Sequence, residues 1–324
     1  MRRLFVALVC AVLLLCEFTS PQTATAQLFL RNRGEQKSIV VDKLNRSFVV
    51  YSPKGQSETP LPLVLVLHGG GSGTSRQLER FTKFNDLAQR EGFITCYPDG
   101  YEGNWNDGRG VSFIKAHSEN VDDVKFFRAM VNQVSKESNV DRSRIFATGI
   151  SNGGFMSHRL AAEASDVFSA VAPIVGGMAV LIGQNFKPKH PVSLFVIQGE
   201  ADPLVPYAGG EVGYKLGRKR GKLLPTTTTI QKYLVRNGIR DRPKSKVMPD
   251  RDPDDGTITE TRSWPAGEGG SKVQFYSIRN GGHTWPGRPL YAPERLIGKV
   301  GNDFDACEEI WKFFKSCPPR KHAR

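Results

Sequence analysis

Gly149-Ile150-Ser151-Asn152-Gly153 places the pattern G-x-S-x-G between a predicted strand and a predicted helix. Residues 144–148 before it are mostly apolar and typical of a strand, and residues 155–163 after it have a helical pattern. In this context the pattern forms a nucleophile elbow, a tight turn that holds the serine hydroxyl above a parallel sheet. A glycine-rich turn with an incidental serine is the alternative, and the rest of the sequence has to decide between them.

The remaining sequence alternates between strand-like and helix-like segments. Residues 63–67 are a continuous apolar run, as expected for a strand buried on both faces of a parallel sheet. The alternation predicts one doubly wound α/β domain, with a mostly parallel central sheet and helices on both faces. Further strands are expected at about residues 38–53 (a hairpin with its turn near 43–46), 93–97, 170–175, 192–197, 258–262 and 273–278, helices at about 74–90, 121–138, 226–237 and 303–315, and an exposed loop over 241–255.

The first 26 residues contain the three parts of an export signal. Arg2 and Arg3 precede an apolar run over residues 4–15, and Ala24-Thr25-Ala26 is typical of a cleavage site. We predict a signal peptide over residues 1–26 with cleavage near Ala26, a single catalytic domain over 27–318 and a basic tail over 319–324, in a protein secreted to the periplasm or the cell exterior. An uncleaved N-terminal anchor is the alternative, although the apolar run is short for a membrane span. No other segment is apolar enough to predict an integral membrane domain.

The sequence is basic, with a formal net charge of +13 at pH 7. Part of this charge lies in one glycine-punctuated segment that contains Lys215, Arg218, Lys219, Arg220 and Lys222. Aromatic residues do not alternate with these charges and no nucleic-acid-binding motif is present, which argues against a nucleic-acid partner. The segment is either a solvated loop or a surface that associates electrostatically with an anionic wall, matrix or substrate.

Three cysteines follow the predicted signal peptide. Cys96 lies in an apolar strand, where a free cysteine behaves as a small core residue. Cys307 and Cys317 fall on one predicted helix, and a helix of that length spans about 15 Å, too far for a disulfide unless the helix ends early. We therefore expect no disulfide or a single one. No spacing of cysteine, histidine or acidic residues fits a metal site, and no cofactor is expected.

A serine nucleophile needs a base within hydrogen-bond reach, and the base needs an acid that fixes its tautomer. On the α/β-hydrolase fold these groups follow one another in the order serine, acid, histidine. His283 is the best placed histidine, since it lies in a glycine-rich loop after the last predicted strand. Two acids follow the preceding buried strand, and we favour Asp202, at the start of a turn, over Glu200. Asp122 and Asp123 open a helix, where acids favour the helix dipole, and catalysis by them is the less favoured alternative.

Ester hydrolysis passes through a tetrahedral oxyanion, and losing one N–H donor to it typically costs about 3 kcal/mol. One donor is expected from the backbone of Asn152, the residue after the candidate nucleophile. The other is expected from Gly70, in the glycine-rich loop that follows the strand at residues 63–67. His68 and Gly69 of the same loop are expected to line the substrate site.

Two tryptophans also fall in loops at the same predicted edge of the sheet. Trp105 lies in the polar, glycine-rich loop over residues 101–118, and Trp285 follows the candidate base closely. We expect their indole rings to stack on an aromatic acyl group or a sugar, with packing inside the loops as the alternative.

Six motifs of the chain occur together, in order, in a known family. They are LHGGG at residues 67–71, YPDG at 97–100, VDDV at 121–124, GISNGG at 149–154, GEADP at 199–203 and GHTWPG at 282–287. This set resembles the polyhydroxybutyrate depolymerase and feruloyl esterase group of secreted α/β-hydrolases, over about residues 38–314. The resemblance implies the α/β-hydrolase fold and a triad of Ser151, Asp202 and His283, the same residues that the chain order indicates.

The resemblance also implies a class of substrate. Depolymerases that attack solid polyester usually carry a linker and a binding domain, which this sequence does not show after its last predicted helix. We therefore expect a serine esterase that acts on polyhydroxyalkanoate oligomers, or on feruloyl and acetyl esters of polysaccharide. A serine peptidase on the same fold, or a non-catalytic carbohydrate- or wall-binding protein, is the alternative, although a binding protein would have no need of an intact triad.

Overall fold

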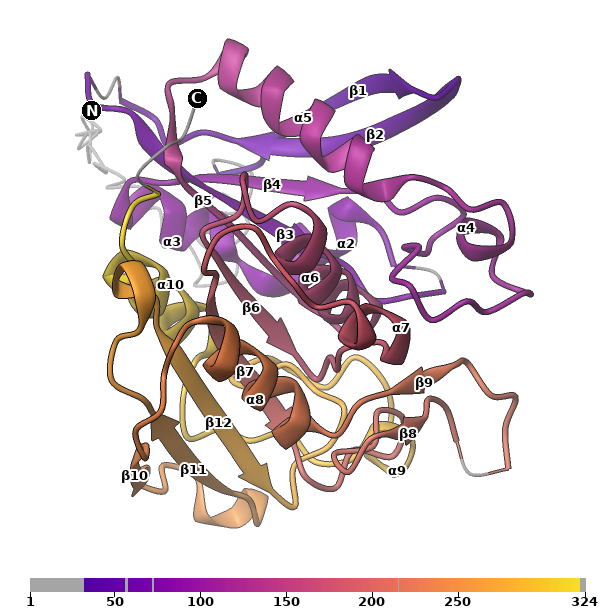
Figure 1. Cartoon of the computed structure of the whole chain (residues 1–324), viewed down its shortest axis with the longest axis vertical. Helices are drawn as coiled ribbons and strands as arrows, with labels where there is room; N and C mark the ends of the chain where they lie inside the picture. The colour runs from indigo at the N-terminus through magenta and orange to yellow at the C-terminus, as the bar shows by residue number, and fades with distance from the viewer. Residues whose placement is uncertain (1–31, 56–57, 72, 215, 321–324) are drawn as a thin grey trace, which may run out of the picture.

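The centre of the molecule is a large mixed β-sheet (Figure 1). The structure, a computed structural model, describes residues 32–55, 58–71, 73–214 and 216–320, so the predicted signal peptide and the end of the basic tail lie outside the described residues. The strands of this part are β1 (Glu35–Val41), β2 (Leu44–Tyr51), β3 (Leu61–Leu67), β4 (Ile94–Pro98), β5 (Val140–Ile150), β6 (Ala170–Ile174), β7 (Ser193–Gly199), β8 (Gly210–Glu211), β9 (Lys222–Leu223), β10 (Lys244–Val247), β11 (Ile258–Ser263) and β12 (Val273–Arg279). Ten of them form one sheet in the order β1-β2-β4-β3-β5-β6-β7-β12-β11-β10, and β8 and β9 form a separate ribbon.

The central strands of the sheet are parallel. β3 pairs with β4 on one side and β5 on the other, and β6, β7 and β12 continue the parallel order. The β1-β2 hairpin extends one edge and β11 and β10 extend the other, in antiparallel pairs. The mostly parallel sheet predicted from the sequence is confirmed. Ligands of such sheets bind at the carboxyl ends of the parallel strands, the edge at which the loops after β3, β5, β7 and β12 leave this sheet.

Helices cover both faces of the sheet, as predicted. The longer ones are α2 (Ser75–Thr82), α3 (Phe84–Glu91), α5 (Asp123–Glu137), α6 (Asn152–Glu163), α8 (Thr226–Arg236) and α10 (Ala306–Ser316), and α4 (Lys115–Ser118), α7 (Val180–Gln184) and α9 (Glu294–Ile297) are single turns. Leu63 and Leu65 of β3 point into a core that α5, α6 and α8 cover. Val64 and Val66 point into a second core, covered by α2, α3 and α10.

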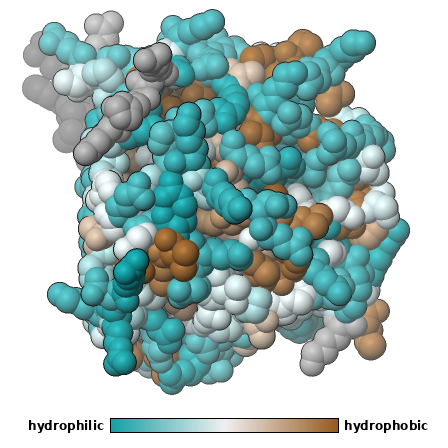
Figure 2. Space-filling view, viewed as in Figure 1, coloured by the Kyte–Doolittle hydropathy of each residue, from teal (hydrophilic) through white to brown (hydrophobic). Residues whose placement is uncertain are grey.

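The outer surface over α5, α6 and α8 is polar. Figure 2 shows that this face is mostly hydrophilic, with small and separate hydrophobic patches. A polar outer side and an apolar inner side are typical of amphipathic helices that cover a core. Among the described residues, no helix combines the length and the apolar character that crossing a membrane would require.

One predicted helix is in fact two helices. The helix expected over residues 74–90 breaks at Lys83, whose φ of 54° lies in the left-handed region. The carbonyl oxygen of Thr82, the last residue of α2, accepts two hydrogen bonds from the guanidinium of Arg288, at 3.0 and 2.8 Å. The partner that stabilises this helix end lies far along the chain, so the local sequence pattern could not predict the break.

Two other segments differ from their predictions. The loop expected over residues 241–255 contains β10, an edge strand whose residues are all exposed. Its polar sequence carries no hydrophobic signal, and only pairing with β11 makes it a strand. The N-terminal hairpin is confirmed, but its turn consists of Asp42 and Lys43, both with positive φ, rather than residues 43–46.

The cysteines of the described residues are free and buried. Burial raises the pKa of the Cys307 thiol, and likewise that of the Cys317 thiol, to about 12, so both stay protonated at neutral pH. Burial raises the pKa of the Cys96 thiol as well. Of the two expected outcomes, no disulfide or a single one, the structure has no disulfide among its described residues.

His158 is a buried titratable group on α6. Its Nδ1 lies 3.1 Å from the hydroxyl of Tyr233, and its Nε2 lies 3.2 Å from the carbonyl oxygen of Gly176. Burial lowers the pKa of His158 from 6.5 to about 4. As the pH falls through this window, the unfolded chain binds a proton that the folded chain does not. The free energy of unfolding is therefore expected to decrease by up to about 3 kcal/mol between pH 6.5 and 4.

Urea denaturation between about pH 7 and 4 would measure this loss. His158→Gln cannot titrate, so we expect a smaller decrease in the free energy of unfolding over the same window. Part of the decrease should remain, because burial also lowers the pKa of His68 and that of His117. A pH dependence equal to that of the wild type would contradict the assignment to His158.

Candidate active site

Ser151 occupies the turn between β5 and α6. Its φ of 56° and ψ of −119° lie outside the regions that residues with side chains favour, and the residue is partly exposed. Its backbone N–H donates to the carbonyl oxygen of Ile174 at 3.0 Å, and its carbonyl oxygen accepts from the N–H of Phe155 at 2.9 Å. The neighbouring strand and helix hold the strained turn in place, so the strand–turn–helix predicted for this stretch is confirmed.

The glycines of the pattern are needed because the turn packs against β3. A Cβ at Gly149 would lie 2.6 Å from the carbonyl oxygen of Leu67, and a Cβ at Gly153 would lie 2.3 Å from the same atom. Any side chain at either position would push the turn away from the sheet. Gly149 is the register partner of Leu67, so the loop that follows β3 leaves the sheet beside Ser151.

Asp202 and His283 lie together beyond the ends of β7 and β12. Nδ1 of His283 is 2.7 Å from Oδ2 of Asp202, and both side chains are buried. β7 and β12 are neighbouring parallel strands, so the loops that follow them leave the same edge of the sheet. The sheet thus brings together two residues that are far apart in sequence.

The carboxylate of Asp202 is fixed by the turn that follows it. Its Oδ1 accepts the N–H groups of Leu204 and Val205, each at 2.8 Å, which leaves Oδ2 for the imidazole. Glu200 is exposed and accepts a hydrogen bond from the hydroxyl of Ser277 at 2.6 Å. Of the two acids considered from the sequence, Asp202 is the one that contacts the imidazole.

The backbone of His283 is held on both sides. Its N–H donates to the carbonyl oxygen of Ile297 at 2.5 Å, and its carbonyl oxygen accepts from the hydroxyl of Tyr291 at 2.7 Å. The loop that supplies these partners is itself tied to the end of α2 by Arg288. The position of the imidazole is therefore set by the protein before any substrate binds.

The loop after β3 brings Gly69 and Gly70 against the turn that carries Ser151. A Cβ at Gly69 would lie 3.6 Å from the Cβ of Ser151. A Cβ at Gly70 would lie 3.2 Å from the Cβ of Asn152, so these two residues adjoin each other. Gly69 is partly exposed and Gly70 is exposed, which leaves their backbone open to a ligand bound at Ser151.

His68 does not line the substrate site, contrary to the prediction. The ring is buried, and the N–H of Gly100 donates to its Nε2 at 2.9 Å. Nδ1 therefore carries the proton and donates a hydrogen bond to the carbonyl oxygen of Gly69 at 2.7 Å. Burial lowers the pKa of His68, which keeps the ring neutral. His68 connects the loop after β3 to Gly100, which follows β4. Without its two hydrogen bonds the ring nitrogens would be buried and unpaired, so the connection is costly to break.

The prediction that Trp105 and Trp285 stack on a substrate is wrong. The exposed fraction is 0% for Trp105 and 1% for Trp285. Trp105 packs against the ring of Phe127, and its Nε1 donates to the carbonyl oxygen of His68 at 3.0 Å. Trp285 packs edge-on against Phe81 in the other core. Burying an indole ring is strongly favourable, and both loops turn inward to place these rings in the core.

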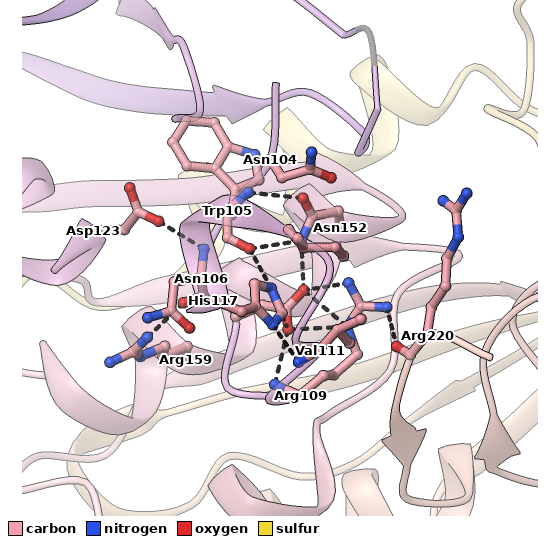
Figure 3. Close-up of polar contacts among 12 residues, drawn as sticks. Asn104, Trp105, Asn106, Arg109, Val111, His117, Asp123, Asn152, Arg159 and Arg220 are labelled. Atoms are coloured by element: carbon pink, nitrogen blue, oxygen red, sulfur yellow. Dashed lines mark hydrogen bonds and ion pairs between the residues drawn. The ribbon is translucent and has the colours of Figure 1, made fainter. Parts of the chain in front are cut away.

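A buried polar network that the sequence did not reveal lies beside Asn152 (Figure 3). The carboxylate of Asp107 is fully buried and pairs with the guanidinium of Arg109 at 2.8 Å. Nε2 of His117 donates to the carbonyl oxygen of Trp105 at 2.9 Å, and burial lowers the pKa of His117. The sequence shows only an acid and a base two residues apart in a polar loop, a pattern that fits a solvated turn equally well.

Asp122 and Asp123 open α5, as predicted. Asp122 caps the helix by accepting the N–H of Lys125 at 2.9 Å. Asp123 is buried, pairs with Arg46 at 2.7 Å and accepts the N–H of Asn106 at 2.7 Å. Across the described part of the chain, histidine, cysteine and carboxylate side chains form no group of three that could hold a metal ion.

The chain is similar to known proteins in both sequence and structure. Residues 46–189 match the family described as "Esterase PHB depolymerase". The chain is 30% identical over 284 residues to "Putative esterase NocK" of Nocardia uniformis subsp. tsuyamanensis, which covers 86% of this chain and 81% of that one. It is 26% identical over 265 residues to feruloyl esterase B of Piromyces equi, covering 80% of this chain and 44% of that one.

A solved structure shares the fold. The acetyl xylan esterase from Aspergillus awamori superimposes with a TM-score of 0.61 at 15% identity, over 88% of this chain and 100% of that one. At this identity the likeness concerns the fold, and it agrees with the central parallel sheet covered by helices on both faces described above.

Proposed function

Since the chain belongs to the esterase PHB depolymerase family and is a carboxylic ester hydrolase, we propose that it works through Ser151, His283 and Asp202 and a covalent acyl-enzyme. The observation that carries the proposal is the hydrogen bond of 2.7 Å between His283 and Asp202. It lies at the edge of the sheet where the strained turn presents Ser151. A strained serine and an oriented acid–histidine pair at one sheet edge are the parts that nucleophilic ester hydrolysis requires.

The proposed reaction begins with proton transfer. Asp202 accepts a hydrogen bond from Nδ1–H of His283 and does not take the proton. The lone pair of Nε2 is therefore free to take the proton of Ser151. The hydroxyl of Ser151 attacks the ester carbonyl as Nε2 removes its proton. The imidazolium then protonates the departing alcohol. A water molecule, deprotonated by the same nitrogen, attacks the acyl-enzyme. The bond between the acyl carbon and Oγ of Ser151 then breaks, the imidazolium returns its proton to Oγ, and the acid is released.

The negative charge of the tetrahedral intermediate needs donors fixed in advance. We propose the backbone N–H groups of Gly70 and Asn152 for this role, because these two residues adjoin each other and Asn152 directly follows Ser151. α6 begins at Asn152, so the positive end of the helix dipole also favours an anion at this point. Gly69, next in the same loop, is proposed to contact the substrate.

The proposed substrates are feruloyl or acetyl esters of polysaccharide, or soluble polyhydroxyalkanoate oligomers. Relatives named as feruloyl and acetylxylan esterases, together with the family described above, support this choice. The test is hydrolysis by the mature chain of p-nitrophenyl acetate, methyl ferulate, an acetylated xylan and a soluble 3-hydroxybutyrate oligomer. We expect turnover of at least one of them.

Two controls accompany this test. The Ser151→Ala variant should lose nearly all turnover of every substrate that the wild type cleaves. Diethyl p-nitrophenyl phosphate should transfer its diethylphosphoryl group to Ser151 of the wild type and release p-nitrophenolate, and mass spectrometry of the peptide would detect the modification. No turnover by a folded wild-type protein, or equal turnover by the variant, would overturn the proposal.

We also propose that the protein is exported and that its basic segment associates with anionic surfaces. The export proposal rests on the features of residues 1–26. In the basic segment, Arg218, Lys219, Arg220 and Lys222 are exposed. Protein recovered outside the cytoplasm is expected to begin near Gln27, and an intact N-terminus would refute cleavage. The protein is expected to bind an anionic polysaccharide matrix at low salt and to be released by added salt. Passage through the matrix at low salt would refute the association.

A further inference from the structure

The side-chain amide of Asn152 is held by Trp105 and Asp107; Figure 3 shows Asn152 beside Trp105. Its Oδ1 accepts the backbone N–H of Trp105 at 2.8 Å. Its Nδ2 donates to the carbonyl oxygen of Trp105 at 3.2 Å and to Oδ2 of Asp107. The exposed fraction of Asn152 is only 2%. The amide cannot turn without leaving buried polar atoms unpaired, so its orientation is fixed.

Asp107 is fixed in turn by a charged partner. Its Oδ1 accepts from Nε of Arg109 at 2.9 Å, and Nε2 of His117 lies 3.8 Å from the same oxygen. Arg109 also donates to the carbonyl oxygen of Arg220 at 2.7 Å and covers the ring of Phe155 in the first turn of α6. The carboxylate of Asp107 is therefore held by residues of its own loop. Arg109 also connects this loop to α6 and to the segment before β9.

The same stretch of chain contacts the loop that carries Gly70. The N–H of Gly71 donates to Oδ1 of Asn104 at 3.2 Å and to the carbonyl oxygen of Gly103 at 3.0 Å. A Cβ at Gly70 would lie 2.7 Å from Oδ1 of Asn104 and 3.2 Å from Oδ1 of Asn152. Residues 103–107 thus connect the two segments whose backbone N–H groups are the proposed oxyanion donors.

We propose that Asp107 is a positioning residue for the oxyanion site. Through the amide of Asn152 it fixes the first residue of α6, so that the backbone N–H of Asn152 points at the place where the oxyanion forms. The inference rests on the proposed esterase mechanism and adds a residue outside the triad. Preorganised donors stabilise the transition state more than the bound substrate, so loosening this contact is expected to lower kcat more than it raises KM.

Asn152→Asp tests the contact without removing the backbone N–H. The new carboxylate has the shape of the amide, and one oxygen can still accept the N–H of Trp105. Its other oxygen replaces the donor and faces the carboxylate of Asp107 and the carbonyl oxygen of Trp105. We expect kcat for p-nitrophenyl acetate to fall about 10- to 100-fold, with KM changed by less than about threefold. A boronic acid that forms a tetrahedral adduct with Ser151 should bind more weakly by a similar factor.

A double variant separates positioning from a general loss of structure. In Asp107→Asn with Asn152→Asp, the amide and the carboxylate exchange places, so a donor again faces an acceptor. Oδ1 of the new residue 107 can still accept from Nε of Arg109, but its NH₂ group replaces the oxygen that lies 2.8 Å from Nη2 of Arg109, so the rescue should be partial. We expect the double variant to recover at least about threefold of the kcat that Asn152→Asp loses.

Asp303→Asn is the matched control. Asp303 is a buried carboxylate that accepts the N–H of Thr259 at 3.0 Å, near the far edge of the sheet. This variant should lower the melting temperature and leave kcat per active site unchanged, with active sites counted by burst titration with diethyl p-nitrophenyl phosphate.

The outcomes of these experiments are distinguishable. A wild type that hydrolyses no ester and does not react with the titrant would overturn both the esterase mechanism and this inference. An active wild type would overturn the inference alone if Asn152→Asp keeps kcat within about threefold of it, or if the double variant recovers nothing.

Discussion

A Ser151→Ala enzyme is expected to lose about 10⁶-fold in kcat for ester hydrolysis, the size of effect measured when the nucleophile of a serine protease is removed. A methyl group cannot form the acyl-enzyme, and the base then has no hydroxyl to activate. The oxyanion donors would remain, so a small rate above that of water should persist. Alanine at a φ of 56° is no more strained than serine, so the fold should be unaffected. Initial rates on p-nitrophenyl acetate and a thermal melt would measure both effects.

Ser157→Ala is the matched control for this substitution. Ser157 lies on α6, the helix that begins at the turn, and its buried hydroxyl donates to the carbonyl oxygen of Gly153 at 2.9 Å. Losing this hydroxyl should leave kcat within a few-fold of the wild type. If Ser151→Ala kept more than about 1% of the wild-type kcat, another residue would have to be the nucleophile.

Asp202→Asn is expected to lower kcat by about 10⁴-fold, as the equivalent change does in another serine hydrolase. The N–H groups of Leu204 and Val205 both donate to Oδ1, so the amide oxygen of asparagine should take that place. Its NH₂ group would then face Nδ1 of His283 and donate to it. The imidazole would carry its proton on Nε2, the nitrogen that has to accept the proton of Ser151. The measurement is kcat on p-nitrophenyl acetate.

Glu200→Gln is the control, because it makes the same chemical change two residues earlier. Glu200 is exposed and contacts Ser277 rather than the imidazole. The kcat of the Glu200→Gln variant should therefore match that of the wild type. Comparable losses in the two variants would refute the assignment of the acid to Asp202.

The fold and the central residues of the site could be predicted because their signals are local. The apolar run of β3, the glycines around Ser151 and the strand ends before Asp202 and His283 each express a constraint within a few residues. A parallel sheet then brings such strand ends to one edge, whatever their separation in sequence. Chain order was enough to choose His283, and the structure shows it beside Asp202.

What could not be predicted depends on partners far along the chain. The break at Lys83 accompanies two hydrogen bonds from Arg288 to Thr82, and β10 exists through its pairing with β11. Trp105 sits in a polar loop, and nothing in that loop indicates that its ring enters the core. Asp107 resembles a solvated acid until Asn152, 45 residues later, is seen to donate to it.

The backbone conformation of Ser151 has a consequence for engineering this enzyme. A residue with a side chain held at a φ of 56° and a ψ of −119° typically costs of order 1–3 kcal/mol of stability. Glycine would relieve that cost and would remove the proposed nucleophile with it. At this one position a substitution that raises thermal stability is therefore expected to abolish turnover. Efforts to make the protein more thermostable should leave the turn alone and improve the outer strands and surface loops instead.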